Sequence, residues 1–219
     1  MPRYYILLYN ILSLLAWMYL TVRVLFPYTT PKLTSTSTPA STTNSEDAVP
    51  LVTAVQSAAV LEILHAALGL VRSSPGAAAV QVGGRNLVVW TVVRRFPELS
   101  TGTGIGFGPL ALRTCLLAWG CSDILRYALF ASVAVFGSAP GWLRWLRYTA
   151  FIVLYPVGFL SEASLVYLAL VKGSGIGAFY RGYLFVGLLA YIPASYFLYT
   201  YMFAQRRRAL GGTERVKKA

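Results

Sequence analysis

The sequence predicts an all-α fold, a polytopic membrane helix bundle of about six transmembrane helices that forms one domain over residues 1–219. The first observation behind this prediction is composition. Hydrophobic residues make up 57% of the chain and charged residues only 12%, whereas soluble domains are typically about 25% charged. The second is the mean hydropathy of +0.61. The third is that several apolar runs reach the length of about 20 residues that a helix needs to cross the hydrocarbon core.

Six apolar segments are expected to cross the membrane. No small-residue cleavage site follows the first, so we expect a retained helix and not a signal peptide. The third is the shortest, and the fifth contains Pro156, which can kink a membrane helix without breaking it. Tyr and Trp residues gather at the segment ends, as is typical of the membrane–water interface. The segments cover residues 4–26, 51–71, 77–94, 109–136, 142–171 and 178–204.

The net charge of +12 is concentrated around the ends of the apolar segments. This distribution is typical of the positive-inside rule and does not indicate nucleic-acid binding. Because six of the 19 basic residues lie in the last 14 positions, residues 205–219 are expected to form a basic cytosolic tail. An even number of spans then places both termini in the cytosol. Membrane lipids with anionic headgroups and a phosphorylated substrate are the partners that such charge attracts.

Residues 29–50 interrupt the apolar pattern with a run rich in Ser, Thr and Pro. A segment of this composition buries too little apolar area to fold, so we expect a disordered loop. We expect no catalytic chemistry in it.

Ionisable side chains inside the predicted spans indicate function, because a charge at membrane depth costs about 2.5–3.5 kcal/mol on insertion scales. Two pairs share a helix face at i, i+3 spacing: Glu62 with His65, and Asp123 with Arg126. Each pair either holds the bundle together or contributes to a site. Arg85 is expected to pair across helices with one of the acidic residues.

Two enzyme classes are excluded by the ligands and loops that they require. Glu62 and His65 form a Glu-x-x-His pattern, but the chain has a single His. Metal sites that need several histidines therefore lack ligands, and we expect no metal and no cofactor. The spacing of Cys121 and Arg126 faintly resembles a cysteine phosphatase loop. It is one residue short and lacks the glycines that shape an anion site, so we reject that activity.

Tyr155 and Glu162 are the strongest candidates for chemistry. They lie seven residues apart in one apolar segment. A helix therefore places them on nearly the same face, about 10 Å apart along its axis. A carboxylate and a phenol that share a dry cavity can act as an acid–base pair.

The pattern Tyr-Pro-x-Gly-x-x-x-Glu, from Tyr155 to Glu162, resembles the signature of the membrane 3-hydroxyacyl-CoA dehydratases. These enzymes act third in the elongation cycle of very-long-chain fatty acids at the endoplasmic reticulum. The resemblance covers nearly the whole chain outside residues 29–50 and the C-terminus. Other matching stretches, in order, are Tyr9-Asn10 with Trp17, Leu61–Ser74, Gln81 with Arg85, Asp123–Tyr127, Trp145–Tyr148 and Tyr191–Pro193.

The resemblance implies a hydro-lyase of the endoplasmic reticulum membrane that converts long-chain or very-long-chain 3-hydroxyacyl-CoA to trans-2-enoyl-CoA. It implies that Tyr155 and Glu162 are the catalytic pair and that no cofactor is used. We assign Glu162 as the base that takes the α-proton and Tyr155 as the acid at the leaving hydroxyl, and the reverse assignment stays open. The condensing enzyme and the two reductases of the cycle are the implied protein partners.

Further residues are expected to support this reaction. Stabilisation of the thioester oxygen and orientation of the catalytic pair are expected from Arg85, Arg126, Arg147, Tyr148, Gly158, Glu62 and His65. The phosphates of CoA are expected near the cytosolic residues Arg72, Arg144 and Arg206.

Two other functions are compatible with the composition. A lipid or proton-coupled transporter would also place ionisable residues in the membrane, but the chain lacks the internal repeat that many transporters show. A catalytically silent scaffold could bind other elongation enzymes, but the intact pair of Tyr155 and Glu162 argues against it.

Overall fold

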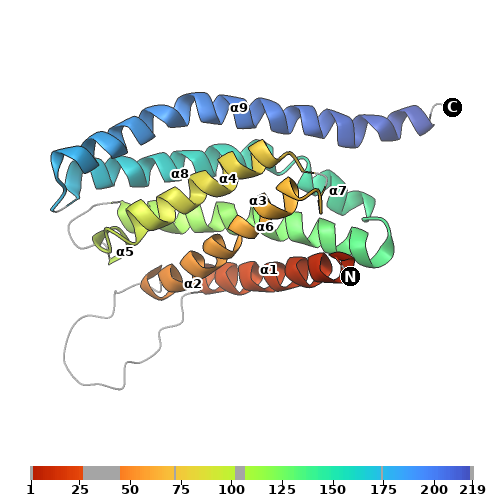
Figure 1. Cartoon of the computed structure of the whole chain (residues 1–219), viewed down its shortest axis with the longest axis horizontal. Coiled ribbons are helices and arrows are strands. Elements are labelled where there is room, and N and C mark those ends of the chain that lie inside the picture. Colours follow the sequence, from red (N-terminus) through yellow and green to blue (C-terminus); the bar gives the residue numbers. More distant parts are fainter. Residues whose placement is uncertain (1, 27–44, 72, 102–106, 174, 218–219) are drawn as a thin grey trace, which may run out of the picture.

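The structure is a computed structural model that describes residues 2–26, 45–71, 73–101, 107–173 and 175–217 (Figure 1). Across these residues the regular structure is helical, which confirms the predicted all-α class. The helices are α1 (Pro2–Leu25), α2 (Ser45–Ala58), α3 (Val60–Ala67), α4 (Pro75–Val88), the π-helix η1 (Val89–Val93), α5 (Glu98–Thr101), α6 (Gly108–Phe136), α7 (Gly141–Arg147), α8 (Phe151–Lys172) and α9 (Ala178–Lys217).

Five segments of the described chain are long and apolar enough to cross a membrane, so the protein is a multi-pass membrane protein. They coincide with five of the six predicted spans. The predicted span 77–94 falls on α4 and η1, which are not among the five. The five segments are Tyr4–Leu25, Ala48–Ala67, Gly108–Phe136, Gly141–Lys172 and Ala178–Gly211.

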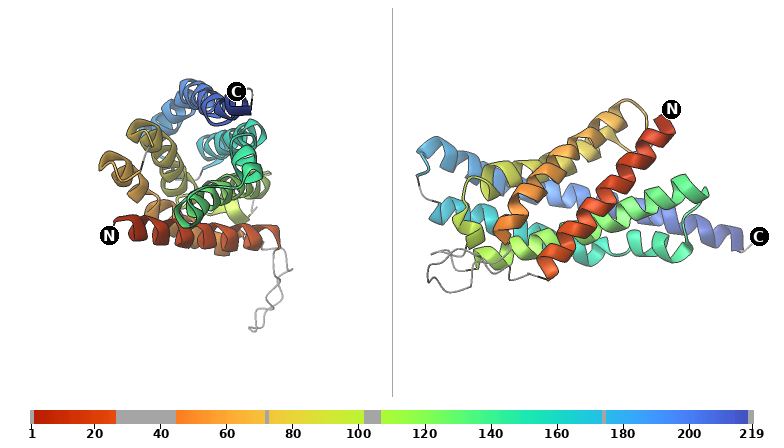
Figure 2. Two further views of the ribbon diagram at one scale, coloured as in Figure 1. Left: turned by 90° about the vertical axis from the view of Figure 1, so that its right-hand side faces the viewer. Right: turned by 90° about the horizontal axis from the view of Figure 1, so that it is seen from below.

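Both described ends of the chain lie at the same end of the bundle (Figure 1). We call this the terminal end; the turn between α6 and α7 lies there too. α4 and η1 run obliquely along the bundle from the terminal end towards the opposite one. Seen from the terminal end, α4, α6, α8 and α9 are arranged around a common centre, with α1 on the outside (Figure 2).

Two predicted spans are each divided into two helices. The span 51–71 divides at Ala59, between α2 and α3, and the span 142–171 divides at residues 148–150, between α7 and α8. Hydropathy alone does not reveal these breaks, because the mean over a window of about 18 residues stays apolar across each of them. The second break matters for the site, since α8 begins only four residues before Tyr155.

The predicted loop and tail differ from the structure at their edges. Residues 45–50 of the predicted loop 29–50 form the start of α2. The physical reason is that Ala48 and Val52, one helical turn apart, are buried in the bundle. The remainder of the predicted loop, residues 29–44, lies outside the described residues. The predicted tail 205–219 continues α9 as a helix to Lys217.

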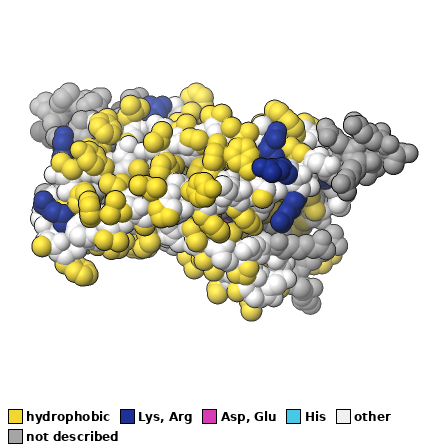
Figure 3. Space-filling view, turned by 90° about the horizontal axis from the view of Figure 1, so that it is seen from above, with side chains coloured by type: hydrophobic (Ala, Val, Ile, Leu, Met, Phe, Trp, Pro, Cys, Tyr) yellow, Lys and Arg dark blue, Asp and Glu magenta, His cyan; other side chains and the backbone are white. Residues whose placement is uncertain are grey.

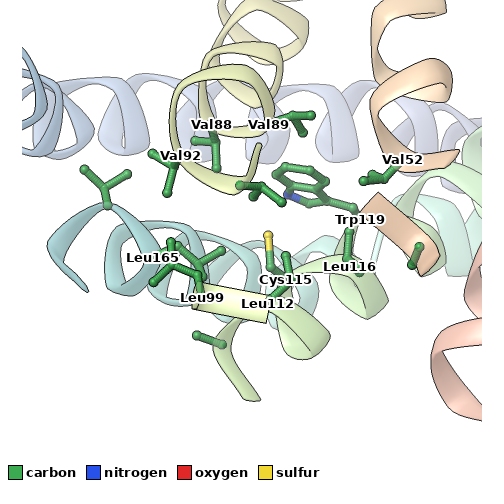
Figure 4. Packing of buried hydrophobic residues seen from close by; sticks show 14 of the residues in the cluster. Val52, Val88, Val89, Val92, Leu99, Leu112, Cys115, Leu116, Trp119 and Leu165 are labelled. Atoms are coloured by element: carbon green, nitrogen blue, oxygen red, sulfur yellow. The ribbon is translucent and has the colours of Figure 1, made fainter. Parts of the chain in front are cut away.

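The core lies where α1, α2, α6, η1 and α8 meet (Figure 4). Val89, Leu112, Leu116 and Leu165 are almost completely buried there, together with Trp119. α1 and α6 approach each other closely at Gly120, where a Cβ atom would lie 2.1 Å from Thr21 Oγ1. Small residues at such contacts let membrane helices pack tightly in the absence of a hydrophobic driving force.

Candidate active site

A cavity of about 540 Å³ lies between α4, η1, α6, α8 and α9. Both members of the predicted catalytic pair line it, as does Gly158, which lies between them on α8. Gly158 is buried, and the nearest atom to a Cβ at this position would be Ala118 Cβ at 3.6 Å. The seven-residue spacing therefore does what the sequence predicts: it places a phenol and a carboxylate in the wall of one cavity.

Glu162 is held by two neutral donors. Trp119 Nε1 on α6 donates to Glu162 Oε1 at 2.6 Å, and the hydroxyl of Tyr191 on α9 donates to Oε2 at 3.1 Å. Within the described part of the chain, no Lys or Arg forms an ion pair with this carboxylate. Because the indole N–H can only donate, Oε1 acts as an acceptor. The carboxylate is thus oriented without being neutralised by a cation.

Tyr155 lies nearer to the terminal end of the same cavity. Its hydroxyl donates to the backbone carbonyl oxygen of Ser195 on α9 at 3.2 Å, and its ring stacks on Tyr199 with centroids 5.4 Å apart. This weak hydrogen bond orients the phenol as a donor. The hydroxyl does not contact Glu162 directly, so a substrate would have to bind between the two groups.

Arg85 brings positive charge into the cavity wall from α4. Its Nη1 contacts Asp123 Oδ2 on α6 at 2.6 Å, which identifies Asp123 as its partner among the acidic residues. The guanidinium carbon lies 5.3 Å from the ring centroid of Trp119. Arg85 is therefore fixed from two sides while its remaining N–H groups stay available to the cavity.

A second polar cluster extends from Arg85 in the cavity wall, through Asp123 on α6, towards α3 and α1. Arg126 contacts Asp123 through Nε at 3.0 Å and Glu62 Oε1 through Nη2 at 2.9 Å. The hydroxyls of Tyr9 and Tyr127 also donate to Glu62. With Arg85, the cluster contains two arginines and two carboxylates, so its charges balance. Such a cluster holds helices together inside the membrane.

Glu62 and His65 share a helix face as predicted, since Tyr9 on α1 contacts both of them. Asp123 and Arg126 do contact each other. Glu62 and His65, in contrast, have different partners: Glu62 pairs with Arg126, and His65 Nε2 lies 3.0 Å from the hydroxyl of Tyr5 on α1. The side chains of Glu62 and His65 therefore link α3 to α6 and to α1, respectively. Arg126, Glu62 and His65 do not line the cavity.

The remaining predicted site residues that the structure describes lie at the terminal end. Arg147 and Tyr148 are half-buried where α7 ends, with the guanidinium carbon 5.9 Å from the ring of Tyr148, and neither lines the cavity. Arg144 lies on α7. Arg206 lies one helical turn after Met202, which lines the cavity. Arg72 lies outside the described residues.

Sequence reasoning missed Trp119 as a functional residue and did not assign a role to Tyr191. Trp119 precedes Asp123 by one helical turn, so a search of the face that carries Asp123 would have found it. The phosphatase pattern is not supported by the surroundings of its residues, since Cys121 is exposed and both carboxylates of the second cluster bind Arg126.

Comparison with known proteins finds a family model and relatives that match most of the chain. A family model described as "Protein tyrosine phosphatase-like protein, PTPLA" matches residues 56–212. The rice protein named very-long-chain (3R)-3-hydroxyacyl-CoA dehydratase PASTICCINO 2A is 38% identical over 170 residues, covering 71% of this chain and 73% of that protein. A Schizosaccharomyces pombe protein named probable very-long-chain (3R)-3-hydroxyacyl-CoA dehydratase is 33% identical over 204 residues, covering 93% of this chain and 91% of that protein. The Caenorhabditis elegans dehydratase hpo-8 is 30% identical and covers 98% of both chains. No solved structure matches.

Proposed function

Because the chain belongs to the protein tyrosine phosphatase-like family, PTPLA, we propose that it dehydrates long-chain or very-long-chain 3-hydroxyacyl-CoA to trans-2-enoyl-CoA. The relatives that match most of its length are named as dehydratases of this kind. One observation on this molecule itself supports the proposal: Tyr155 and Glu162 line one largely apolar cavity together with Arg85. These groups are the acid, the base and the cation that the reaction requires.

Glu162 acts as the base in this proposal. Dehydration breaks the bond between the α-carbon and its proton, and the carboxylate takes that proton. Oε1 and Oε2 already accept hydrogen bonds from Trp119 and Tyr191. These contacts fix the plane of the carboxylate while leaving a lone pair on each oxygen for the incoming proton.

Tyr155 acts as the acid. The bond between the β-carbon and its hydroxyl oxygen breaks, and the phenol donates the proton that completes a water molecule. Its hydroxyl is already a donor, to the carbonyl oxygen of Ser195. Substrate binding replaces this contact with one to the leaving hydroxyl. The proton on Glu162 then returns to the Tyr155 phenolate through the product water, which restores both groups.

Arg85 stabilises the negative charge that develops on the thioester oxygen. Preorganised donors aimed at developing charge are usually the largest contribution to such catalysis. Of the three arginines that the sequence suggests for this role, only Arg85 lines the cavity. Arg126 is engaged by Glu62 and Asp123, and Arg147 lies beyond the cavity wall. We therefore assign Arg126, with Glu62 and Asp123, a structural role.

CoA binds with its phosphates at the terminal end in this proposal. Arg206 lies one turn beyond the cavity-lining Met202, and Arg144 lies on α7 at the same end. The terminal end then faces the cytosol, where acyl-CoA is soluble, and the protein lies in the endoplasmic reticulum membrane. The condensing enzyme and the reductases of the elongation cycle are its proposed neighbours.

The direct test is turnover by the purified protein in detergent. We expect a long-chain 3-hydroxyacyl-CoA to lose one water and to yield the trans-2-enoyl thioester, detected by mass spectrometry. The Cys121→Ser variant is the matched control for phosphatase-type chemistry and should keep full activity. If folded protein produces no enoyl thioester across a range of chain lengths, the proposed function is wrong.

A further inference from the structure

The wall of the active-site cavity is closed on one side and open on the other. The residues contributed by α6 and α8 are buried or half-buried, as with Trp119 and Gly158. Among the described lining residues, those with exposed side chains come only from α4 and α9. They are Ala79, Val80, Leu87, Tyr183, Val186 and Ala190. The cavity therefore has its opening between α4 and α9, along the flank of the bundle.

Glycines occupy both edges of this opening. Gly83 and Gly84 on α4 and Gly187 on α9 all line the cavity, and a Cβ atom added at any of them would meet nothing within 4 Å. Close helix packing therefore does not require these glycines, unlike Gly120. A glycine inside a helix is about 1 kcal/mol less favourable than alanine. Together, Gly83, Gly84 and Gly187 leave both edges of this opening free of side chains.

The surface around the opening is apolar. Phe185, Leu189 and Ile192 on α9 are exposed beside it. Seen from the α9 side, hydrophobic side chains cover the middle of the molecule, while Lys and Arg lie towards its two ends (Figure 3). In a membrane protein this arrangement places the middle of the surface in the hydrocarbon layer. The opening therefore faces acyl chains of the bilayer and not water.

The length of the cavity does not suffice for a very long acyl chain. On α9, Tyr191 lies beside the catalytic groups, because it contacts Glu162. The cavity lining on α9 ends at Tyr183, on the side away from the terminal end. These residues are two turns apart on α9, a rise of about 12 Å. A saturated chain of about twenty carbons, with C–C bonds of about 1.5 Å, extends over more than roughly 20 Å. Its distal half must lie elsewhere.

We propose that the opening between α4 and α9 is a lateral portal through which the distal part of the acyl tail leaves the cavity and lies among the membrane lipids. This inference rests on the proposed function, since it concerns the tail of the same substrate. The cavity then holds only the reacting carbons and the proximal tail. It follows that the enzyme does not discriminate between substrates by the full length of the acyl chain. Gly84 and Gly187 set the width of the portal through which the tail passes.

The test is to narrow the portal without touching the catalytic groups. Gly187→Leu and Gly84→Leu each place a side chain at one edge. Gly182→Leu is the matched control, because Gly182 lies on α9, has free space around a Cβ atom and does not line this cavity. Each variant is assayed in detergent with 3-hydroxyoctanoyl-CoA and 3-hydroxyicosanoyl-CoA, and its thermal unfolding is recorded.

We expect kcat/KM for the icosanoyl substrate to fall about 10-fold or more in both portal variants, the scale on which added methylenes disturb an apolar site. For the octanoyl substrate, kcat/KM should change less than about 2-fold, which also shows that the variants are folded. Gly182→Leu should leave kcat/KM unchanged for both substrates. Equal losses of kcat/KM for both substrates, or no loss for the longer one, would overturn the proposed portal but not the proposed function. Failure of the unmodified protein to convert either substrate would overturn the proposed function, and the portal with it.

Discussion

Tyr191→Phe is the sharpest probe of how Glu162 is held, because it removes one hydroxyl and leaves the ring. That hydroxyl donates to Glu162 Oε2 at 3.1 Å, whereas the other oxygen keeps its 2.6 Å bond from Trp119. A hydrogen bond to a charged group contributes about 1.5–3 kcal/mol. A donor–acceptor distance of 3.1 Å is long for an O–H donor, so we take the lower end, about 1.5 kcal/mol.

A loss of this size corresponds to a fall in kcat of about 10-fold. The fall arises because the carboxylate keeps a single anchor and can rotate away from the α-proton. KM should change less than about 3-fold, since Tyr191 orients the base and does not hold the substrate. The assay is steady-state formation of enoyl-CoA in detergent, beside thermal unfolding of each variant.

Tyr183→Phe is the matched control. Tyr183 lies on the same helix and lines the same cavity, but it is not among the donors to Glu162. We expect its kcat to stay within about 2-fold of the unmodified protein, since no hydrogen bond to the base is lost. Equal effects of the two variants on kcat would show that the hydrogen bond from Tyr191 does not orient Glu162. A rise in kcat with Tyr191→Phe would also contradict the prediction, because the hydroxyl would then weaken the base more than it orients it.

Three further variants test the packing and the excluded chemistry. Asp123→Asn removes the carboxylate shared by Arg85 and Arg126, and should destabilise the protein by about 3–5 kcal/mol, seen as a lower unfolding midpoint in detergent; unchanged unfolding would refute a structural cluster. Gly120→Ala forces a Cβ atom to 2.1 Å from Thr21 Oγ1, and should destabilise by about 1–3 kcal/mol, whereas an unchanged midpoint would contradict the close contact of α1 and α6. Cys121→Ser changes an exposed side chain away from the cavity, and its dehydration rate should match that of the unmodified protein; a large loss would reopen thiol chemistry.

Hydropathy predicts most of the fold because membrane spans are long and their signal sums over many residues. It does not predict the breaks at Ala59 and at residues 148–150, since a few residues of altered backbone do not change the mean hydropathy. The start of α2 at Ser45 was also not predicted. There, a polar composition favours disorder while burial of Ala48 and Val52 favours a helix.

Tyr155 and Glu162 could be predicted to line one site because both lie on a single helix. Their spacing fixes the face, whatever the neighbouring helices do. The partners of Arg85, Glu62 and His65 could not be predicted, since each depends on the register between two helices, which the spacing in one of them does not contain. Trp119 could have been noticed on the helix face of Asp123, but its hydrogen bond to Glu162 could not be predicted, because it follows from α6 packing against α8.

The central claim is that Tyr155 and Glu162 act together as acid and base. A double-mutant cycle with Tyr155→Phe, Glu162→Gln and the combined variant tests it most directly, with kcat and unfolding measured for each. We predict that each single change lowers kcat by about 10²–10⁴-fold, with the unfolding midpoint unchanged. The combined variant should be little worse than the poorer single one, because residues that act as a unit are not additive. Near-normal turnover in either folded single variant, or effects that multiply fully in the double, would contradict the claim.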